Sequence, residues 1–161
     1  MIIIGIDPGT SRIGYGIIKS ESNKLSLLDY GTIEPKSKEI KFKFLEINDS
    51  LEALIKLWQP KKAGIERIFF TKNQKTGISV AEARGVIMHC LLKNGINTKE
   101  YRPQDIKQAV TGYGAADKIS VAKMVKTILK IGDLKGYDDS WDALAISLTR
   151  AFDKDLESLS R

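Results

Sequence analysis

Ile2-Ile3-Ile4-Gly5-Ile6-Asp7-Pro8-Gly9, at the start of the chain, carries its strongest structural signal. The run from Ile2 to Ile6 is apolar at every position, which predicts a central strand with both faces covered by helices. Asp7 follows directly, and a carboxylate there is costly to desolvate unless a cation, hydrogen bonds or a polar crevice receives it. Ligand crevices form at the ends of such strands, so Asp7 is a candidate functional residue. The alternative is that Asp7 only caps the turn at Pro8-Gly9.

Hydrophobic spacing predicts the rest of the fold. Two further strands, at residues 14–18 and 25–33, continue from the first as an antiparallel meander. A spacing of three and four predicts a helix at 38–58. A strand at 63–70, a basic loop at 72–77, a helix at 78–93 and a strand at 97–101 follow. Helices are then expected at 103–110, at 118–130 after a cap at Asp117, and after a cap at Asp138 or Asp139. This order predicts one α/β domain over residues 1–161, a mixed five-stranded sheet with antiparallel first three strands, flanked by helices.

Composition excludes several classes of protein. The chain has 161 residues, of which 42% are hydrophobic, enough for an ordinary core. No run approaches the roughly 18 apolar residues of a membrane span, and no basic N-terminal region leads into an apolar segment, so a cytoplasmic protein without membrane contact is expected. The single Cys90 and single His89 argue against cysteine clusters, histidine-rich zinc sites and a histidine triad, and both are expected to pack in a core or interface. Any bound metal should therefore have oxygen ligands.

The net charge of +6 is unevenly distributed. Residues 61–130 carry fourteen Lys and Arg against five Asp and Glu, whereas residues 131–161 carry four against seven. A basic middle beside acidic elements suits a protein that grips a polyanion in one region and processes it in another. A solvated lysine-rich surface without a partner is the alternative.

Four acids are placed at strand ends and at a helix start. Besides Asp7, Glu66 is near the end of a short apolar strand, and Asp139 and Asp142 share one face of the last helix. Asp138 and Asp139 also suit the first turn of a helix, but Asp142 precedes an apolar run and would face the sheet. Like charges are tolerated there mainly with a shared cation. Oxygen ligands favour Mg²⁺ or Mn²⁺, and two such ions about 3.5–4 Å apart are the usual device for cutting a phosphodiester.

Several motifs, taken together and in order, resemble one family. They are Gly5-Ile6-Asp7-Pro8-Gly9, Gly14-Tyr15-Gly16, Ile65-Glu66 with Phe69, Ala83-Arg84-Gly85, and Asp139-Ser140-Trp141-Asp142-Ala143-Leu144-Ala145. The chain resembles the RuvC family of bacterial Holliday-junction resolvases. The resemblance implies a ribonuclease-H-like fold, a homodimer, Mg²⁺-dependent nicking of two strands of a four-way DNA junction in recombination and repair, and a RuvA and RuvB branch-migration complex as partner. It also implies that the catalytic, metal-binding acids are Asp7, Glu66, Asp139 and Asp142, with two Mg²⁺ ions per site and Mn²⁺ as a substitute.

Basic residues of the site also follow from this resemblance. The matching positions are Lys107 and Lys118, with catalytic and DNA-binding roles. Asp138 lies one residue before the matching acid pair and is left out of the site. Trp141 departs from the small residue expected between the two acids; it either packs inward, which we favour, or contacts DNA.

An aromatic residue and a group of cations are predicted to contact DNA. Phe69 and Phe70 would alternate in their strand, and we assign Phe69 to stacking on an unpaired base. Lys72 and Lys75 would grip phosphates beside it, with Arg84 on the same side. The alternative is that both phenylalanines are core residues or that one lies at a subunit contact.

The helix at 78–93 is the candidate dimer interface. Its small residues Ala81, Ala83 and Gly85 permit close approach, and its apolar surface exceeds one sheet-facing stripe. A twofold dimer supplies two identical sites for two symmetric nicks.

Two other functions fit part of the pattern. Gly5-Ile6-Asp7-Pro8-Gly9-Thr10 also looks like the first phosphate loop of actin-like ATPases and sugar kinases, but those proteins close two such domains around a nucleotide and no second loop is visible here. A junction- or RNA-binding protein without catalysis is the other candidate, although a pure binder of polyanions gains nothing from four converging carboxylates. Mg²⁺-dependent strand cleavage, as against ATP turnover, separates the three.

Overall fold

The computed structural model describes residues 1–22, 24–67, 74–133 and 138–153, with the side chains of residues 74–76 excepted. Their elements are β1 (Ile2–Asp7), β2 (Ile13–Glu21), β3 (Lys24–Ile33), α1 (Ile40–Trp58), β4 (Lys62–Glu66), α2 (Gln74–Lys93), β5 (Asn97–Tyr101), α3 (Pro103–Thr111), α4 (Lys118–Leu129) and α5 (Asp138–Phe152). Within the described residues, none of these helices is long and apolar enough to cross a membrane.

The strands form one five-stranded sheet in the order β3-β2-β1-β4-β5. β1 pairs antiparallel with β2, and β2 with β3, whereas β1 pairs parallel with β4, and β4 with β5. The predicted mixed sheet with its antiparallel start is therefore confirmed. β1 suits the central place because Ile3, Ile4 and Ile6 are almost completely buried, on both faces of the sheet.

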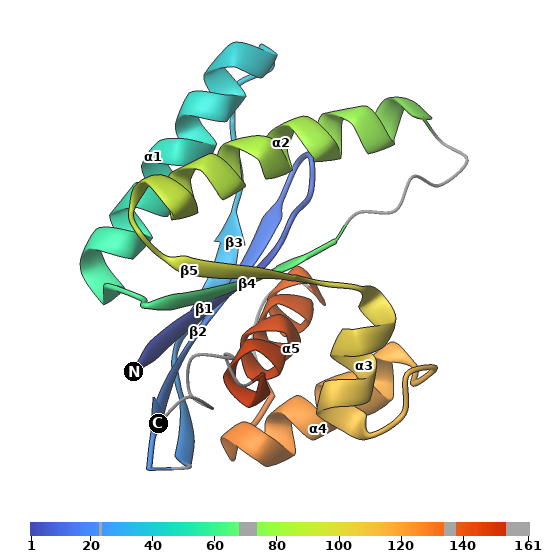
Figure 1. Cartoon of the computed structure of the whole chain (residues 1–161). Helices are drawn as coiled ribbons and strands as arrows, with labels where there is room; N and C mark the ends of the chain where they lie inside the picture. The colour runs from blue at the N-terminus through green and yellow to red at the C-terminus, as the bar shows by residue number, and fades with distance from the viewer. Residues whose placement is uncertain (23, 68–73, 134–137, 154–161) are drawn as a thin grey trace.

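Helices cover both faces of the sheet (Figure 1). Ile4 and Ile6 of β1 belong to a core cluster with α1 and α2, including Leu51 and Leu91. Ile3 belongs to the opposite cluster, with α3, α4 and α5. Successive residues of a strand point to opposite faces, so a strand between two helical layers needs apolar residues at every position.

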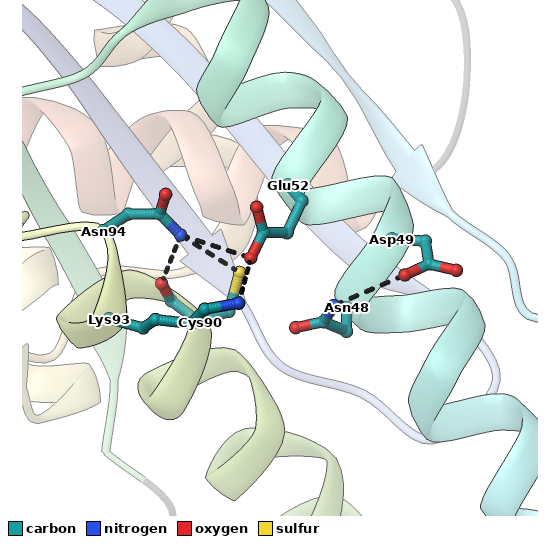
Figure 2. Close-up of polar contacts among 6 residues, drawn as sticks. All are labelled: Asn48, Asp49, Glu52, Cys90, Lys93 and Asn94. Atoms are coloured by element: carbon teal, nitrogen blue, oxygen red, sulfur yellow. Dashed lines mark hydrogen bonds and ion pairs between the residues drawn. The ribbon is translucent and has the colours of Figure 1, made fainter.

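α1 and α2 are joined by a small polar cluster near the end of α2 (Figure 2). Glu52 of α1 accepts a hydrogen bond from Lys93 Nζ at 3.2 Å and from Asn94 Nδ2 at 3.5 Å, and Asn94 Nδ2 also donates to the Cys90 carbonyl at 2.8 Å. Cys90 is buried in the core, as expected, and burial raises the pKa of its thiol to about 11. His89 lies exposed on α2, so it is not a core residue.

Several predicted boundaries were wrong, and one of them is β2, which is Ile13–Glu21 where 14–18 was predicted. α2 begins at Gln74, so residues 74–77, predicted as loop, are helical. An established helix gains one hydrogen bond for each residue added, which outweighs the roughly 1 kcal/mol cost of Gly77. β4 ends at Glu66, before the predicted limit, while Phe69, Phe70 and Lys72 lie outside the described residues. Asp138 and Asp139 both lie within the first turn of α5, where the helix dipole favours carboxylates.

Candidate active site

Four carboxylates from three elements line one pocket of about 380 Å³; they are Asp7, Glu66, Asp139 and Asp142, here called the acid cluster. Asp7 ends β1 and Glu66 ends β4. These strands are parallel neighbours with Ile6 paired to Ile65, so their last residues reach the same edge of the sheet. The first turns of α5 bring Asp139 and Asp142 to that edge.

Two glycines let α5 lie directly against the strands. A β-carbon on Gly14 would come within 2.1 Å of the Asp139 carbonyl oxygen, and one on Gly5 within 2.1 Å of the Ala143 carbonyl oxygen. Any larger residue at either position would push the helix away. The Gly14-Tyr15-Gly16 motif therefore positions the acid cluster through backbone contact.

The acid cluster is electrostatically unfavourable by itself. Burial, with repulsion from Glu66, Asp142 and Asp139, raises the pKa of Asp7 from 3.8 to about 8. Burial and then Asp142 also raise the pKa of Glu66. Both groups resist ionisation unless positive charge approaches.

Two lysines line the same pocket, at the positions that the family resemblance implied. Lys118 Nζ donates to Asp142 Oδ2 at 3.1 Å, and this hydrogen bond raises the pKa of Lys118 above its ordinary value. The predicted cap at Asp117 is confirmed, since its side chain accepts from the Ser120 amide at 2.7 Å, which fixes the start of α4. Lys107 reaches the pocket from α3.

Arg12 is a further cation at the site that sequence reasoning missed. It precedes β2, and its Nε lies 3.2 Å from Asp139 Oδ2. That oxygen is buried and accepts no hydrogen bond from the described residues. The sequence feature that could have identified Arg12 is its position as a basic residue in the turn that follows Asp7.

The residues present fit a divalent cation by their chemistry. All four side chains of the acid cluster offer carboxylate oxygens, which Mg²⁺ and Mn²⁺ prefer, and a divalent ion would relieve the repulsion around Asp7. In the described part of the chain, however, no three Asp, Glu, His or Cys side chains are arranged closely enough to hold an ion as they stand. Asp139 and Asp142 are instead each held by a cation, Arg12 and Lys118.

Other predicted residues are placed elsewhere. Arg84 forms an ion pair with Glu100 of β5 and does not line the pocket. Lys75 lies on α2, but its side chain is outside the described residues, as are Phe69 and Lys72. Asp138 is exposed and outside the pocket.

Trp141 is half-buried and packs against the core cluster of α3, α4 and α5, as predicted. Lys126 Nζ lies 5.4 Å from the centre of its ring. This arrangement orients Trp141 as a packing residue of α5.

Comparison with known proteins gives a consistent result. A family model described as "Crossover junction endodeoxyribonuclease RuvC" matches residues 3–150. Proteins with that description from Petrotoga mobilis and Prochlorococcus marinus are 45% and 47% identical, over 90% and 92% of this chain and 90% and 97% of theirs. The structure of T. thermophilus RuvC in complex with a Holliday junction substrate matches with a TM-score of 0.88 at 30% identity, covering 94% of this chain and 93% of that one. The fold is therefore the ribonuclease-H-like fold of these resolvases.

Proposed function

Because the chain belongs to the RuvC family of crossover junction endodeoxyribonucleases, we propose that it resolves four-way DNA junctions by paired symmetric nicks during homologous recombination and repair. The observation that carries this proposal is that four carboxylates and two lysines line one pocket. Neither the ATPase reading nor the reading as a non-catalytic binder accounts for that set of residues.

The acid cluster would hold the metal, Mg²⁺ with Mn²⁺ as a substitute and two ions per site. When bound, Mg²⁺ supplies stabilisation of developing negative charge and an activated water at the scissile phosphate. Lys118 is cationic at neutral pH, as lysines ordinarily are, and its hydrogen bond to Asp142 raises its pKa further. With Lys107 it would attract the DNA strand into the pocket and neutralise charge on the phosphate.

Further DNA contacts are proposed for Phe69, Lys72, Lys75 and Arg84. Phe69 follows Glu66 by three residues and would stack on an unpaired base at the crossover. Arg84 is held by Glu100, so contact with DNA would require a phosphate to replace that carboxylate. A guanidinium binds either group with the same paired geometry.

A homodimer through α2 would place two such pockets at a fixed separation. Ile78, Gly85 and Leu92 follow one another at seven-residue intervals and so share a helix face. Ile78 and Leu92 are 55% and 59% exposed, and a β-carbon on Gly85 would meet nothing within 4 Å. This face is thus open and in part apolar, with the exposed Glu82 and His89 on it as well, and Gly85 permits close approach by a second copy. A RuvA and RuvB branch-migration complex is the proposed partner on the junction.

Cutting of a synthetic four-way junction tests the function directly. The junction should have a crossover that can migrate through varied sequence, with two opposing strands labelled. We expect paired nicks at symmetric positions with Mg²⁺, none with EDTA, and weak activity on plain duplex. Unpaired nicks with equal activity on duplex would defeat the resolvase proposal, and ATP turnover would favour the kinase-like alternative.

A further inference from the structure

We propose that Arg12 couples metal loading to DNA binding. Its guanidinium holds Asp139 while DNA is absent; when a strand enters the pocket, the guanidinium transfers to a backbone phosphate and leaves Asp139 to the divalent cation. This inference rests on the proposed function of the acid cluster as a metal-dependent nuclease site.

The turn between β1 and β2 places Arg12 for this exchange. The turn is tight, since a β-carbon on Gly9 would come within 2.1 Å of the Arg12 carbonyl oxygen. The backbone of Arg12 is therefore tied to the loop that begins at Asp7. From there its Nε reaches to 3.2 Å from Asp139 Oδ2.

The Arg12 side chain contacts Asp139 and is accessible from solvent. It is 42% exposed, so an incoming strand can reach it from solvent. A planar guanidinium pairs with carboxylate and phosphate oxygens in the same geometry and is always charged. A phosphate that pairs with Nε and one Nη of Arg12 would replace Asp139 at that edge of the guanidinium.

Asp139 gains a ligand site when Arg12 leaves. Its Oδ2 is buried and accepts no hydrogen bond from the described residues. Without Arg12 the Asp139 carboxylate would lose this ion pair while still repelling Asp7, which favours a cation. The ion pair thus competes with metal binding in the absence of DNA.

The same contacts account for the spread of the carboxylates. Asp139 is drawn to Arg12 on the β1–β2 turn and Asp142 to Lys118 at the start of α4. These cations lie on different elements, so each carboxylate of α5 is directed to its own partner. Metal binding has to displace these contacts before the carboxylates can converge.

The expected change in cation affinity follows from the partial exposure of the Arg12–Asp139 ion pair. A partly exposed ion pair contributes little to stability, so its loss should change cation affinity by about three- to fivefold. Linkage requires that DNA raise cation affinity by the same factor as the cation raises DNA affinity.

The test uses Ca²⁺, which also takes carboxylate ligands, on full-length wild type, Arg12→Gln and Arg12→Lys. Melting temperature against Ca²⁺ concentration gives the cation midpoint without DNA. Fluorescence anisotropy with a labelled junction gives DNA affinity with and without Ca²⁺, and gels check that the junction stays intact. Lys19→Gln, which removes an exposed ion pair with Glu21 on β2, is the charge-matched control.

We expect Arg12→Gln to lower the Ca²⁺ midpoint about three- to fivefold and to shrink the Ca²⁺ enhancement of junction affinity by a similar factor. Arg12→Lys, which keeps the charge, and Lys19→Gln should stay near wild type. An unchanged or higher midpoint in Arg12→Gln would overturn the inference. A lower midpoint with unchanged coupling would also overturn it, since Arg12 would then act through its charge alone. If the melting temperature of wild type did not change with Ca²⁺ concentration, the proposed metal site itself would be refuted.

Discussion

At the scale of single residues, the fold places the four carboxylates of the acid cluster on one pocket, and the proposed reaction depends on them. Asp7 is half-buried at the end of the central strand, beside three other carboxylates. An ionised carboxylate in this place destabilises the folded state when no cation is bound, and it can serve as a ligand when a cation binds. Two consequences can be measured separately, one on cleavage and one on stability.

The proposed metal site predicts the effect on cleavage, because an amide keeps the shape of each carboxylate but would lose its bond to the metal. We expect Asp7→Asn, Glu66→Gln, Asp139→Asn and Asp142→Asn each to reduce the rate of junction cleavage by about a thousandfold or more, with junction binding retained. Single-turnover cutting and anisotropy measure the two properties. Asp138→Asn, at an exposed position outside the pocket, should cut like wild type. Normal cutting by any of the first four variants at saturating Mg²⁺ would remove that residue from the site.

The effect on stability has a definite sign. The pKa of Asp7 is raised from 3.8 to about 8 in the folded chain, so across that pH range the folded state keeps a proton that the unfolded state has lost. The free energy of unfolding of the metal-free protein should therefore fall as pH rises from about 4 to about 8. Asp7→Asn removes this dependence, and we expect the metal-free variant to melt about 3 °C or more above wild type at pH 8.

Thermal unfolding in EDTA between pH 5 and pH 8 measures that difference. Asp49→Asn, on the exposed surface of α1, is a matched change of an ordinary carboxylate and should leave the melting temperature unaltered. If Asp7→Asn melted at or below wild type at pH 8, the ionised Asp7 would not be destabilising and the interpretation of its pKa would be wrong.

At the scale of elements, the contact between α5 and the β1–β2 pair sets the geometry of the site. Gly14→Ala would force a β-carbon against the Asp139 carbonyl, 2.1 Å away, and displace the start of α5. We expect a loss of about 1–3 kcal/mol in the free energy of unfolding and a clear loss of cleavage. Gly114→Ala is the control, because the nearest atom to its β-carbon is at an ordinary 3.4 Å. Urea unfolding of both variants provides the test; equal stabilities would show that α5 does not rest on Gly14.

At the scale of the whole molecule, the proposed dimer would supply the two active sites that two symmetric nicks require. Ile78→Glu would place a charge on the open face of α2, whereas Leu57→Glu makes the same change on α1, at a side chain that is 70% exposed. We expect wild type and Leu57→Glu to size as dimers at micromolar concentration, and Ile78→Glu to size as a monomer that makes unpaired nicks. A monomeric wild type, or a dimeric Ile78→Glu, would place the interface elsewhere or abolish it.

The sequence by itself determined the sheet, the order of its elements and the four acids that line the pocket, while Lys107 and Lys118 followed from the family resemblance. Local patterns are sufficient for this, because Ile2 to Ile6 can avoid water only between two helical layers and carboxylates at parallel strand ends meet at one edge. The start of α2 escaped prediction because helix propagation is cooperative and does not stop at each weak residue.

Only the tertiary structure decided which charges meet. Arg12 contacts Asp139, and Arg84 contacts Glu100, across long stretches of chain. No local pattern specifies such pairs, because they depend on strand register and on how closely α5 approaches Gly5 and Gly14. Hydrophobic periodicity records which face of an element is buried, but the partner of each polar side chain is fixed only when those faces pack together.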